Sequence, residues 1–578
     1  MQLDDLFIDK SDEIFDVIIV GSGITGGWAA KEFAERGFKT LMVERGRKVI
    51  HRQDYPTEGK GPWEFDNRTL VDKKTEDEEY NIQKKCYAFS DQTKHFFGND
   101  KDLPYTTEKN TGFTWIRGNQ LGGKSLTWHR QCYRMSDFDF NANKADGHGT
   151  DWPIRYKDVA PWYSYVEKFA GISGGIDNLE QLPDGEHLPP FEFNNPELSI
   201  KEKLEKFFPD RTMIMGRTAH LSKPEPHHMQ QGRIQCQTRN ECQKGCSFGA
   251  YFSTQSATLP AAAKTGNLRV ATDSVVHSVI YDETKNRVAG VRIIDANTKE
   301  QREFRGKIVF LCASTLGSTQ VLLHSTSKAF PNGLANSSGV LGHYLMDHCF
   351  AANAGGEIVG FEDETDYGRR PTGVYIPNFQ YEPKRYHSKY KRGFAIGGGA
   401  GRGSWRGLIN EKGIGVNYKE AITRPGNWEI HLYAQGEMLP RFENSVSLND
   451  KAKDAWGIPQ LHMDVSFSEN EHLMMDDAAA QMHQILEKAG VKNVFSNNYI
   501  NSVDPGIAIH EVGTARMGRD PKSSVLNGYN QSHDVPNLFV TDGASYCSVS
   551  TVNPSLTFMA LTARAVDFAA KEVKNKRI

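Results

Sequence analysis

A run of apolar residues that ends in a glycine-rich turn is the first regular pattern in the chain. Residues 17–20 are Val-Ile-Ile-Val, and the turn Gly-Ser-Gly-Ile-Thr-Gly-Gly follows directly at 21–27. Apolar residues then recur at the spacing of a helix as far as Gly37, and a second apolar run at 40–43 ends before Glu44. This order predicts a strand, a helix and a second strand over residues 15–45, which is the start of a parallel sheet.

The rest of the chain alternates irregular and regular stretches. Residues 50–110 are polar and lack periodicity, so they predict a long surface excursion or lid. Residues 175–230 are rich in proline and predict irregular loop. The regular patterns predict a turn and helix at 151–172, and then a β-meander at 268–270, 275–280 and 288–294 that a strand at 307–311 closes. Strands that alternate with glycine-rich turns are predicted at 350–465. A strand at 538–540 and a long helix from Pro554 complete the predicted elements.

Length, composition and charge exclude several classes of protein. A chain of 578 residues exceeds one simple core, so we expect two intertwined lobes. The net charge of −3 and the pI near 6.7 give no basis for binding nucleic acid or an anionic membrane surface. No apolar run approaches the ~20 residues of a membrane span. The acidic N-terminus lacks the regions of a signal peptide, which predicts a cytoplasmic protein, or a periplasmic one if a signal-bearing partner exports it folded.

The first βαβ pattern carries a dinucleotide-binding fingerprint. Gly21 permits the tight turn, Gly23 lets the backbone approach a pyrophosphate at the positive end of the helix, and Gly26 lets helix and strand pack closely. Glu44 follows Gly21 by 23 residues, where a carboxylate accepts hydrogen bonds from an adenosine ribose. A glycine-rich loop alone is often a plain turn, but the strand, helix and terminal acid together predict nucleotide binding.

Further motifs follow in a fixed order. Residues 117–129 read Arg-Gly-Asn-Gln-Leu-Gly-Gly-Lys-Ser-Leu-Thr-Trp-His, and adjacent glycines free backbone N–H groups to meet an anion or a flat ring. Residues 509–518 read Ile-His-Glu-Val-Gly-Thr-Ala-Arg-Met-Gly. Thr-Asp-Gly at 541–543 then precedes Asn553-Pro554, where the last helix is predicted to begin.

Taken together, these motifs resemble those of the glucose–methanol–choline (GMC) oxidoreductases along nearly the whole chain. Smaller motifs are similar to those of the sugar-oxidising members, which include pyranose oxidases and the flavoprotein subunits of sugar dehydrogenases. Among these, the glucoside 3-dehydrogenase-like group is the most similar. The smaller motifs are Gly-Thr-Asp-Trp-Pro-Ile at 149–154, Leu-Met-Asp-His at 345–348, Asn-Ser-Val-Ser-Leu at 444–448 and Gly-Ile-Pro at 457–459.

The resemblance implies an α/β protein with a Rossmann-like FAD-binding domain and a second, sheet-based substrate-binding domain. The FAD-binding domain is expected to be discontinuous, at 1–60, 111–140, 230–349 and 500–578. Residues 61–110 are expected to form the lid, and 141–229 with 350–499 the substrate-binding domain. The residues expected to bind FAD are Gly21, Gly23, Gly26, Glu44, Arg45, Gly118, Gly122, Gly123, Ser125, Val276, Asp542, Gly543 and Thr557.

The same resemblance places His510 and Asn553 at the catalytic pair in front of flavin N5. A neutral imidazole can take the hydroxyl proton of an alcohol while the flavin takes the hydride, and an amide can donate a hydrogen bond to the same oxygen. The alternatives are a structural histidine and a helix-capping asparagine before Pro554, and capping by the amide oxygen would leave its NH₂ free. A nearby helix start would also favour an anionic reduced flavin.

One position departs from the pyranose oxidases. Their segment equivalent to residues 122–128 carries a histidine bonded covalently to the flavin, and this chain has Thr127 there, followed by Trp128. Because threonine has no imidazole, FAD is expected to be non-covalent. His129 is either an active-site neighbour or a structural donor.

Three of the eight cysteines, Cys236, Cys242 and Cys246, fall within eleven residues. Thiolates at such spacing can hold an iron–sulfur cluster. By resemblance to some sugar dehydrogenase flavoprotein subunits, three ligands favour a [3Fe-4S] cluster that serves as an electron exit. The alternatives are a disulfide with a free thiol, or buried thiols that pack as small hydrophobes. Zinc is disfavoured because no histidine stands at the spacing of a fourth ligand.

The resemblance implies oxidation of a secondary alcohol of a sugar or glycoside to a keto-sugar, with electrons passed to an acceptor other than oxygen. The position, C3, rests on the resemblance alone. A small subunit and a cytochrome c-type acceptor are the partners that the resemblance suggests. The alternatives are an oxidase that makes hydrogen peroxide, an NAD-dependent dehydrogenase, and a non-catalytic nucleotide-binding subunit. An NAD enzyme would have no use for the C-terminal His and Asn-Pro motifs, and a non-catalytic subunit would be expected to lack His510 or Asn553.

Overall fold

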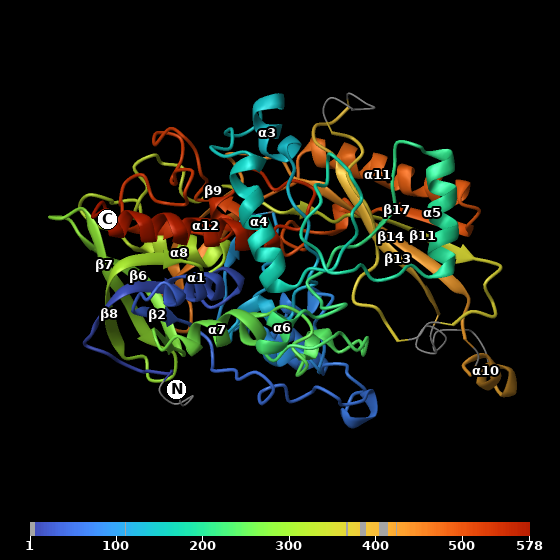
Figure 1. Ribbon diagram of the computed structural model, residues 1–578, viewed down its shortest axis with the longest axis horizontal. Helices are drawn as coiled ribbons and strands as arrows, with labels where there is room; N and C mark the ends of the chain where they lie inside the picture. The colour runs from blue at the N-terminus through green and yellow to red at the C-terminus, as the bar shows by residue number, and fades with distance from the viewer. Residues whose placement is uncertain (1–5, 110, 366–367, 382–388, 404–413, 424) are drawn as a thin grey trace.

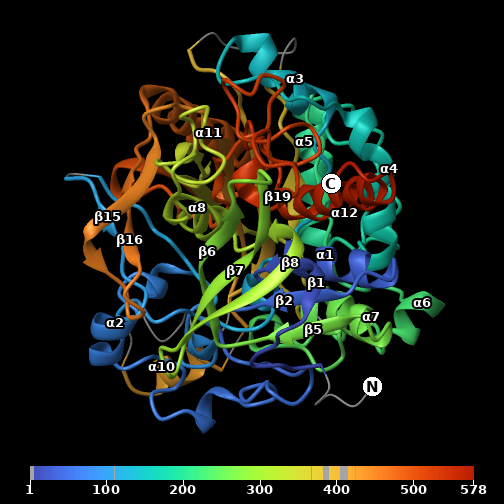
Figure 2. The same cartoon turned by 90° about the vertical axis from the view of Figure 1, so that its left-hand side faces the viewer.

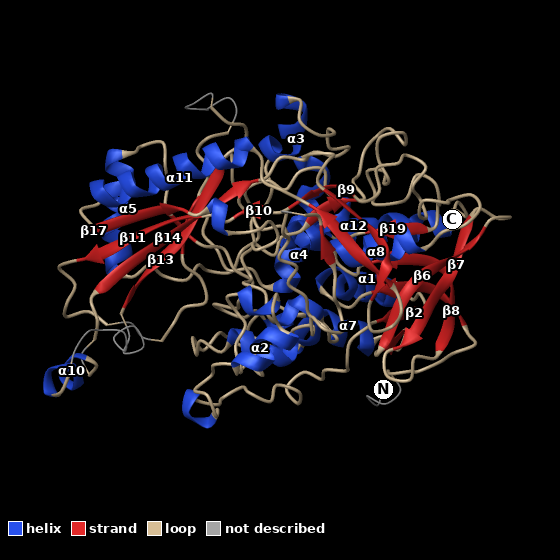
Figure 3. Ribbon diagram, turned by 180° about the vertical axis from the view of Figure 1, so that it is seen from behind, coloured by secondary structure: helices blue, strands red, loops and turns tan. Residues whose placement is uncertain are grey.

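The computed structural model describes residues 6–109, 111–365, 368–381, 389–403, 414–423 and 425–578, so most of the acidic N-terminus lies outside it. Two large sheets stand at opposite ends of the molecule, and irregular segments and short helices fill the space between them (Figure 1, Figure 3). The α/β class predicted from the sequence is therefore confirmed, while the predicted domain boundaries stay predictions.

The first sheet contains the predicted βαβ unit. β1 (Ile14–Val20) pairs in parallel with β2 (Thr40–Val43), and α1 (Ile24–Glu35) connects them. Trp28 on α1 is fully buried, and its ring meets that of Phe169 edge-on at 5.2 Å. The aromatic contact joins α1 to α4 (Tyr156–Ala170), the helix predicted within 151–172.

The strand order of this sheet is β5-β2-β1-β8-β7-β6, with β19 on β8 (Figure 2). The two halves of β8 have different partners. The first half pairs antiparallel with β7, and the second half lies parallel between β1 and β19. The predicted meander is therefore right for three strands and wrong for the first, since β5 pairs in parallel with β2 at the other edge. The strands are β5 (Leu268–Ala271), β6 (Ser274–Asp282), β7 (Arg287–Asp295), β8 (Gln301–Leu311) and β19 (Leu538–Val540).

The second large sheet is antiparallel and has the order β17-β11-β14-β13-β12-β4, with β10 on β14. α11 (Glu469–Lys488) lies along one face and buries Met474, Met482 and Leu486 there. The strands are β4 (Ile214–Met215), β10 (His348–Cys349), β11 (Ala352–Ile358), β12 (Val374–Ile376), β13 (Phe394–Arg402), β14 (Trp428–Glu437) and β17 (Lys492–Asn498).

A smaller sheet of order β18-β9-β15-β16-β3 lies between the two. Its strands are β3 (Thr106–Thr107), β9 (His343–Met346), β15 (Ser445–Lys453), β16 (Pro459–Asp464) and β18 (Val512–Thr514). The remaining helices are α2 (Lys73–Glu79), α3 (Asp137–Asp146), α5 (Asn195–Phe207), α6 (Pro226–Gln230), α7 (Leu259–Lys264), α8 (Thr315–His324), α10 (Val416–Ala421) and α12 (Ser555–Lys574).

The structure corrects the prediction of irregular loop over 175–230. α5 begins there with a capping box, in which Asn194 accepts from the backbone N–H of Glu197 at 3.0 Å. Ile200 and Leu204, one turn apart, are buried on the face that packs against α11. Among the described residues, none of the helices combines the length and the apolar composition that crossing a membrane requires.

Candidate active site

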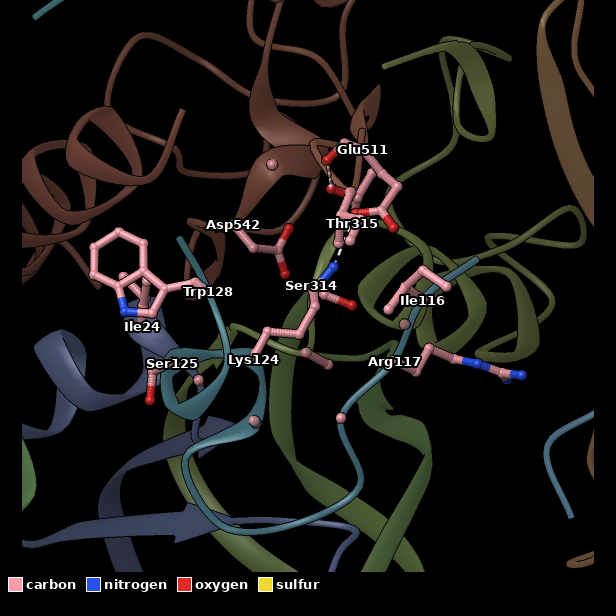
Figure 4. Close-up of a pocket in the computed structure, with 18 of the residues that line it drawn as sticks. Ile24, Ile116, Arg117, Lys124, Ser125, Trp128, Ser314, Thr315, Glu511 and Asp542 are labelled. Atoms are coloured by element: carbon pink, nitrogen blue, oxygen red, sulfur yellow. Dashed lines mark hydrogen bonds and ion pairs between the residues drawn. The ribbon is translucent and has the colours of Figure 1, made fainter. Parts of the chain in front are cut away.

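A long pocket opens at the carboxyl ends of β1 and β2, where α1 begins. Residues from both glycine clusters and from the C-terminal segments line it, as expected for a ligand at this edge of a parallel sheet. Figure 4 shows side chains from these separate segments facing one space. Ten of the thirteen residues predicted to bind FAD line the pocket: Gly21, Gly23, Glu44, Arg45, Gly118, Gly123, Ser125, Val276, Asp542 and Gly543.

The turn after β1 leaves no room for side chains except toward the pocket. Gly21 has φ +94°, and a Cβ there would lie 2.4 Å from the carbonyl oxygen of Cys312. A Cβ on Gly26 would lie 2.0 Å from the oxygen of Gly21, so Gly26 permits the close packing of α1 on β1 without lining the pocket. A Cβ on Gly23 would meet no protein atom within 4 Å. The space beside Gly23 is therefore a cradle that a side chain would partly fill.

Glu44 ends β2 at the pocket wall and is 7% exposed. Its carboxylate accepts hydrogen bonds from the backbone N–H and hydroxyl of Ser22 and, at 2.8 Å, from the N–H of Gly46. Burial raises its pKa, and these donors oppose the rise. The carboxylate is thus held at the position where the sequence predicts a ribose.

The second glycine cluster closes the opposite wall. The N–H of Gly122 donates to the hydroxyl of Ser22 at 2.8 Å, which ties this loop to the first glycine turn. Gly122 itself does not line the pocket, but Thr127 does. Lys124 extends into the pocket and forms an ion pair with Glu511 at 3.0 Å (Figure 4).

The Thr-Asp-Gly motif follows β19 and lies against α8. Asp542 accepts hydrogen bonds from the hydroxyl of Ser318 and the N–H of Ala544, and burial raises its pKa to about 6. Thr557, on α12, does not line the pocket, and its hydroxyl lies 2.7 Å from that of Tyr163.

His510 and Asn553 meet at one wall of the pocket although 43 residues separate them. Nδ2 of Asn553 lies 3.3 Å from Nε2 of His510. Burial and the nearby His348, Lys124 and His129 hold the pKa of His510 well below its usual value, so its ring is neutral. The helix-capping alternative for Asn553 is not seen: Pro554 is the N-cap of α12 and no side chain caps it, and Oδ1 of Asn553 makes no hydrogen bond with a described atom.

A buried carboxylate holds the backbone before His510. Asp347 accepts from the N–H groups of Ala508 at 3.0 Å and His510 at 2.9 Å. Burial and the charge of Glu511 raise the pKa of Asp347 to about 7. Between these two N–H groups, Ile509 has φ +63°, a conformation that a β-branched residue rarely adopts. The two hydrogen bonds stabilise this strained turn, which points the His510 ring at the pocket.

Aromatic and polar side chains surround the part of the pocket beside His510. The ring of Phe350 lies 5.9 Å from that of His510 and 5.4 Å from that of Tyr433. Tyr87, from the predicted lid, lies 5.8 Å from His129. The residues beside His510 that line the pocket are Tyr87, His129, Gln131, Phe350 and Tyr433.

The cysteine triplet lies behind the second glycine cluster. Arg130 joins the two regions, since its guanidinium donates to the backbone carbonyls of Leu126 at 2.7 Å and Cys242 at 2.6 Å. All three cysteines are half-buried, and their thiols are unpaired in the structure. His220 Nε2 lies 3.5 Å from Sγ of Cys242.

Several residues of the site were not predicted to be functional from the sequence. Asp347 and His348 stood only as part of a family motif, and Glu511 only as a neighbour of His510. The roles of Phe350 and Tyr433 depend on long-range contacts, and no local pattern marks them. The sequence signal that could have found this pair is Asp347 followed directly by His348, at the end of an apolar run.

Comparison with known proteins agrees with this architecture. Two family models described as GMC oxidoreductase match residues 15–350 and 440–562. A 2-methyl-1,2-propanediol dehydrogenase from Mycolicibacterium austroafricanum is 28% identical over 96% of this chain and 95% of its own length. The fructose dehydrogenase large subunit of Gluconobacter japonicus is 25% identical over 97% of this chain and 98% of its own.

The fold is also that of a solved structure, the pyridoxine 4-oxidase from Mesorbium loti. The two structures align with a TM-score of 0.57 at 16% identity, covering 96% of this chain and 99% of the other. The resemblance noted in the sequence is thus confirmed: the chain belongs to the GMC oxidoreductase family, whose members typically bind FAD.

Proposed function

We propose that this protein oxidises a secondary alcohol of a sugar or glycoside, at C3, to a keto-sugar with FAD as the hydride acceptor. The observation that carries the proposal is the meeting of a neutral His510 and Asn553 at the wall of a pocket built on a dinucleotide fingerprint. The choice of a sugar, and of its C3, rests on the resemblance of the smaller motifs to the sugar-oxidising branch.

The residues of the pocket fit FAD. The open cradle at Gly23 and the free N–H groups at the start of α1 suit a pyrophosphate, and Glu44 suits a ribose. FAD, when bound, would accept a hydride at N5. Thr127 on the pocket wall offers no imidazole for a covalent bond, so FAD would be held non-covalently.

The chain's own groups would then handle the proton and the substrate oxygen. Nε2 of His510 would take the hydroxyl proton, while Nδ2 of Asn553 donates a hydrogen bond to the same oxygen. The carbon that loses the hydride becomes the carbonyl carbon, so the alcohol loses one hydride and one proton, which together are two electrons and two protons. Phe350 and Tyr433 offer the apolar faces that pack on a sugar ring, and His129 and Gln131 offer polar groups for its hydroxyls.

The thiol triplet would hold a [3Fe-4S] cluster as an electron exit. The three cysteines fall within eleven residues and are half-buried, and Arg130 connects this segment to the pocket loop. A relay of this kind favours a dye or a cytochrome over oxygen as acceptor. It also fits the similarity to a dehydrogenase large subunit, which suggests a small partner subunit.

Two simple observations test the cofactor and the electron acceptor. The purified protein should be yellow, and acid precipitation should release the chromophore into the supernatant; colour retained by the precipitate would refute non-covalent FAD. After anaerobic reduction by substrate, a dye should reoxidise the flavin faster than oxygen does. Rapid reoxidation by oxygen with formation of hydrogen peroxide would favour the alternative, an oxidase.

A further inference from the structure

A second histidine, His348, lies behind His510, and the proposed reaction assigns it no role. It is fully buried on β10, and its Nδ1 lies 3.0 Å from Nδ1 of His510. The two rings stand nearly perpendicular, at 81°, with centroids 4.9 Å apart. Nε2 of His348 is buried. Burial lowers the pKa of the ring to about 3, and a hydrogen bond to the backbone of Ser550 opposes this lowering.

With the Asn553 amide oriented as in the structure, its nitrogen facing His510, the tautomers of both rings follow. The amide nitrogen of Asn553 carries only donor hydrogens, so His510 Nε2 must be the acceptor of their hydrogen bond. A neutral imidazole that accepts at Nε2 carries its proton at Nδ1. The Nδ1–H of His510 therefore donates to Nδ1 of His348, whose own proton is then at Nε2.

We propose that His348 is a positioning residue that holds His510 in the tautomer whose Nε2 can accept the substrate's proton. This inference rests on the proposed function, because it presumes that His510 is the base. In that step the substrate O–H bond would break and its electron pair would form the C=O bond. The proton would join Nε2, and the hydride would leave the carbon that bears the oxygen for the FAD that the pocket would hold. His510 then carries a proton on both nitrogens, and its Nδ1–H still donates to Nδ1 of His348.

The other charged and titratable groups around His510 do not supply this acceptor. Lys124 and His129 disfavour a positive charge on the ring. Asp347 binds the backbone N–H of His510 and not its ring, and Glu511 pairs with Lys124. Among the described residues, His348 is the hydrogen-bond partner of His510 Nδ1.

Two substitutions at His348 distinguish the loss of a hydrogen-bond acceptor from the loss of side-chain packing. His348→Leu fills the space but removes the acceptor, whereas Oδ1 in His348→Asn can occupy the place of Nδ1. We expect His348→Leu to slow anaerobic flavin reduction by the holoenzyme by on the order of 10–100-fold with little change in substrate Kd, less than the ~10⁴ that a wrong tautomer costs a serine protease. His348→Asn should recover most of that rate.

His228→Leu is a matched control. His228, on α6, is also buried, but its ring contacts the backbone N–H of Glu225 and the backbone carbonyl of Lys168 on α4, and it does not line the pocket. This variant should reduce its flavin at the wild-type rate. Equal slowing in His348→Leu and His348→Asn, or a wild-type rate in His348→Leu, would overturn the proposal.

Nitrogen-15 spectra of histidine-labelled protein give a readout that does not depend on turnover. The signals lost in His510→Ala belong to His510, and we expect a protonated Nδ1 and an unprotonated Nε2. An Nε2-protonated ring in the wild type would overturn the inference about His348. A wild-type rate of flavin reduction in His510→Ala would instead refute the proposed function, so the two failures are distinguishable.

Discussion

Nε2 of His510 faces the pocket beside the amide of Asn553, and the proposed chemistry depends on these two side chains. His510→Ala should fold and keep FAD, because the ring is not part of the FAD cradle. Its flavin reduction by substrate should slow by about 10²–10⁴-fold, the usual contribution of a general base. Asn553→Ala should lose less, since one hydrogen bond is worth roughly 1–3 kcal/mol. Stopped-flow absorbance measures the rate of flavin reduction in each variant. If His510→Ala reduces its flavin at the wild-type rate, His510 is not the base.

The pKa of His510 also predicts a pH profile. The neutral ring is the competent form, and it is present above the pKa. Because burial and the neighbouring His348, Lys124 and His129 hold that pKa well below the ordinary value of about 6.5, the contribution of His510 to the rate constant for flavin reduction should stay constant as pH falls through this value. This contribution to the rate constant should fall only at distinctly lower pH, where the His510 ring becomes protonated. A rate that halves near pH 6.5 in wild type, and not in a variant lacking His510, would contradict this environment.

At the scale of elements, two glycines of the same turn have separable roles. Gly26→Ala would place a Cβ 2.0 Å from the oxygen of Gly21, so the apoprotein should lose about 1–3 kcal/mol of unfolding free energy. Gly23→Ala meets no protein atom, so the apoprotein should keep its stability while FAD affinity falls about tenfold or more, equal to ~1.4 kcal/mol. Denaturant unfolding and FAD titration separate the two effects. Equal FAD affinity in Gly23→Ala and wild type would place the pyrophosphate elsewhere.

Local patterns predicted the elements that carry the fingerprint, because β1, α1 and β2 are short, periodic and bounded by glycines. The helix α5 was missed although Asn194 and Glu197 form a capping box, since the surrounding prolines dominated the interpretation. The sequence also could not show that β5 joins β2 rather than β6, because strand partners are chosen by tertiary packing. His348 and His510, 162 residues apart, form a pair that only the fold brings together.

At the scale of the whole molecule, the cysteine triplet bears on how electrons leave. We expect about three irons per chain in protein purified anaerobically, in keeping with three thiolate ligands. Cys242→Ser should lose iron and slow electron transfer to dyes, while flavin reduction by substrate stays unchanged. Cys349→Ser, at a buried thiol outside the triplet, is the matched control and should keep its iron. Iron near zero in the anaerobic wild-type protein, with transfer to dyes intact, would mean that the triplet is structural.

The central claim is that the pocket oxidises a ring hydroxyl of a sugar. Anaerobic mixing of the yellow holoenzyme with a panel of glycosides, sugars and simple diols, followed by product analysis, tests it most directly. We predict that a glycoside bleaches the flavin absorption near ~450 nm and yields the 3-keto product, with a 3-deuterated glycoside reacting more slowly. Bleaching by simple diols alone, or a product oxidised at another carbon, would contradict the assignment.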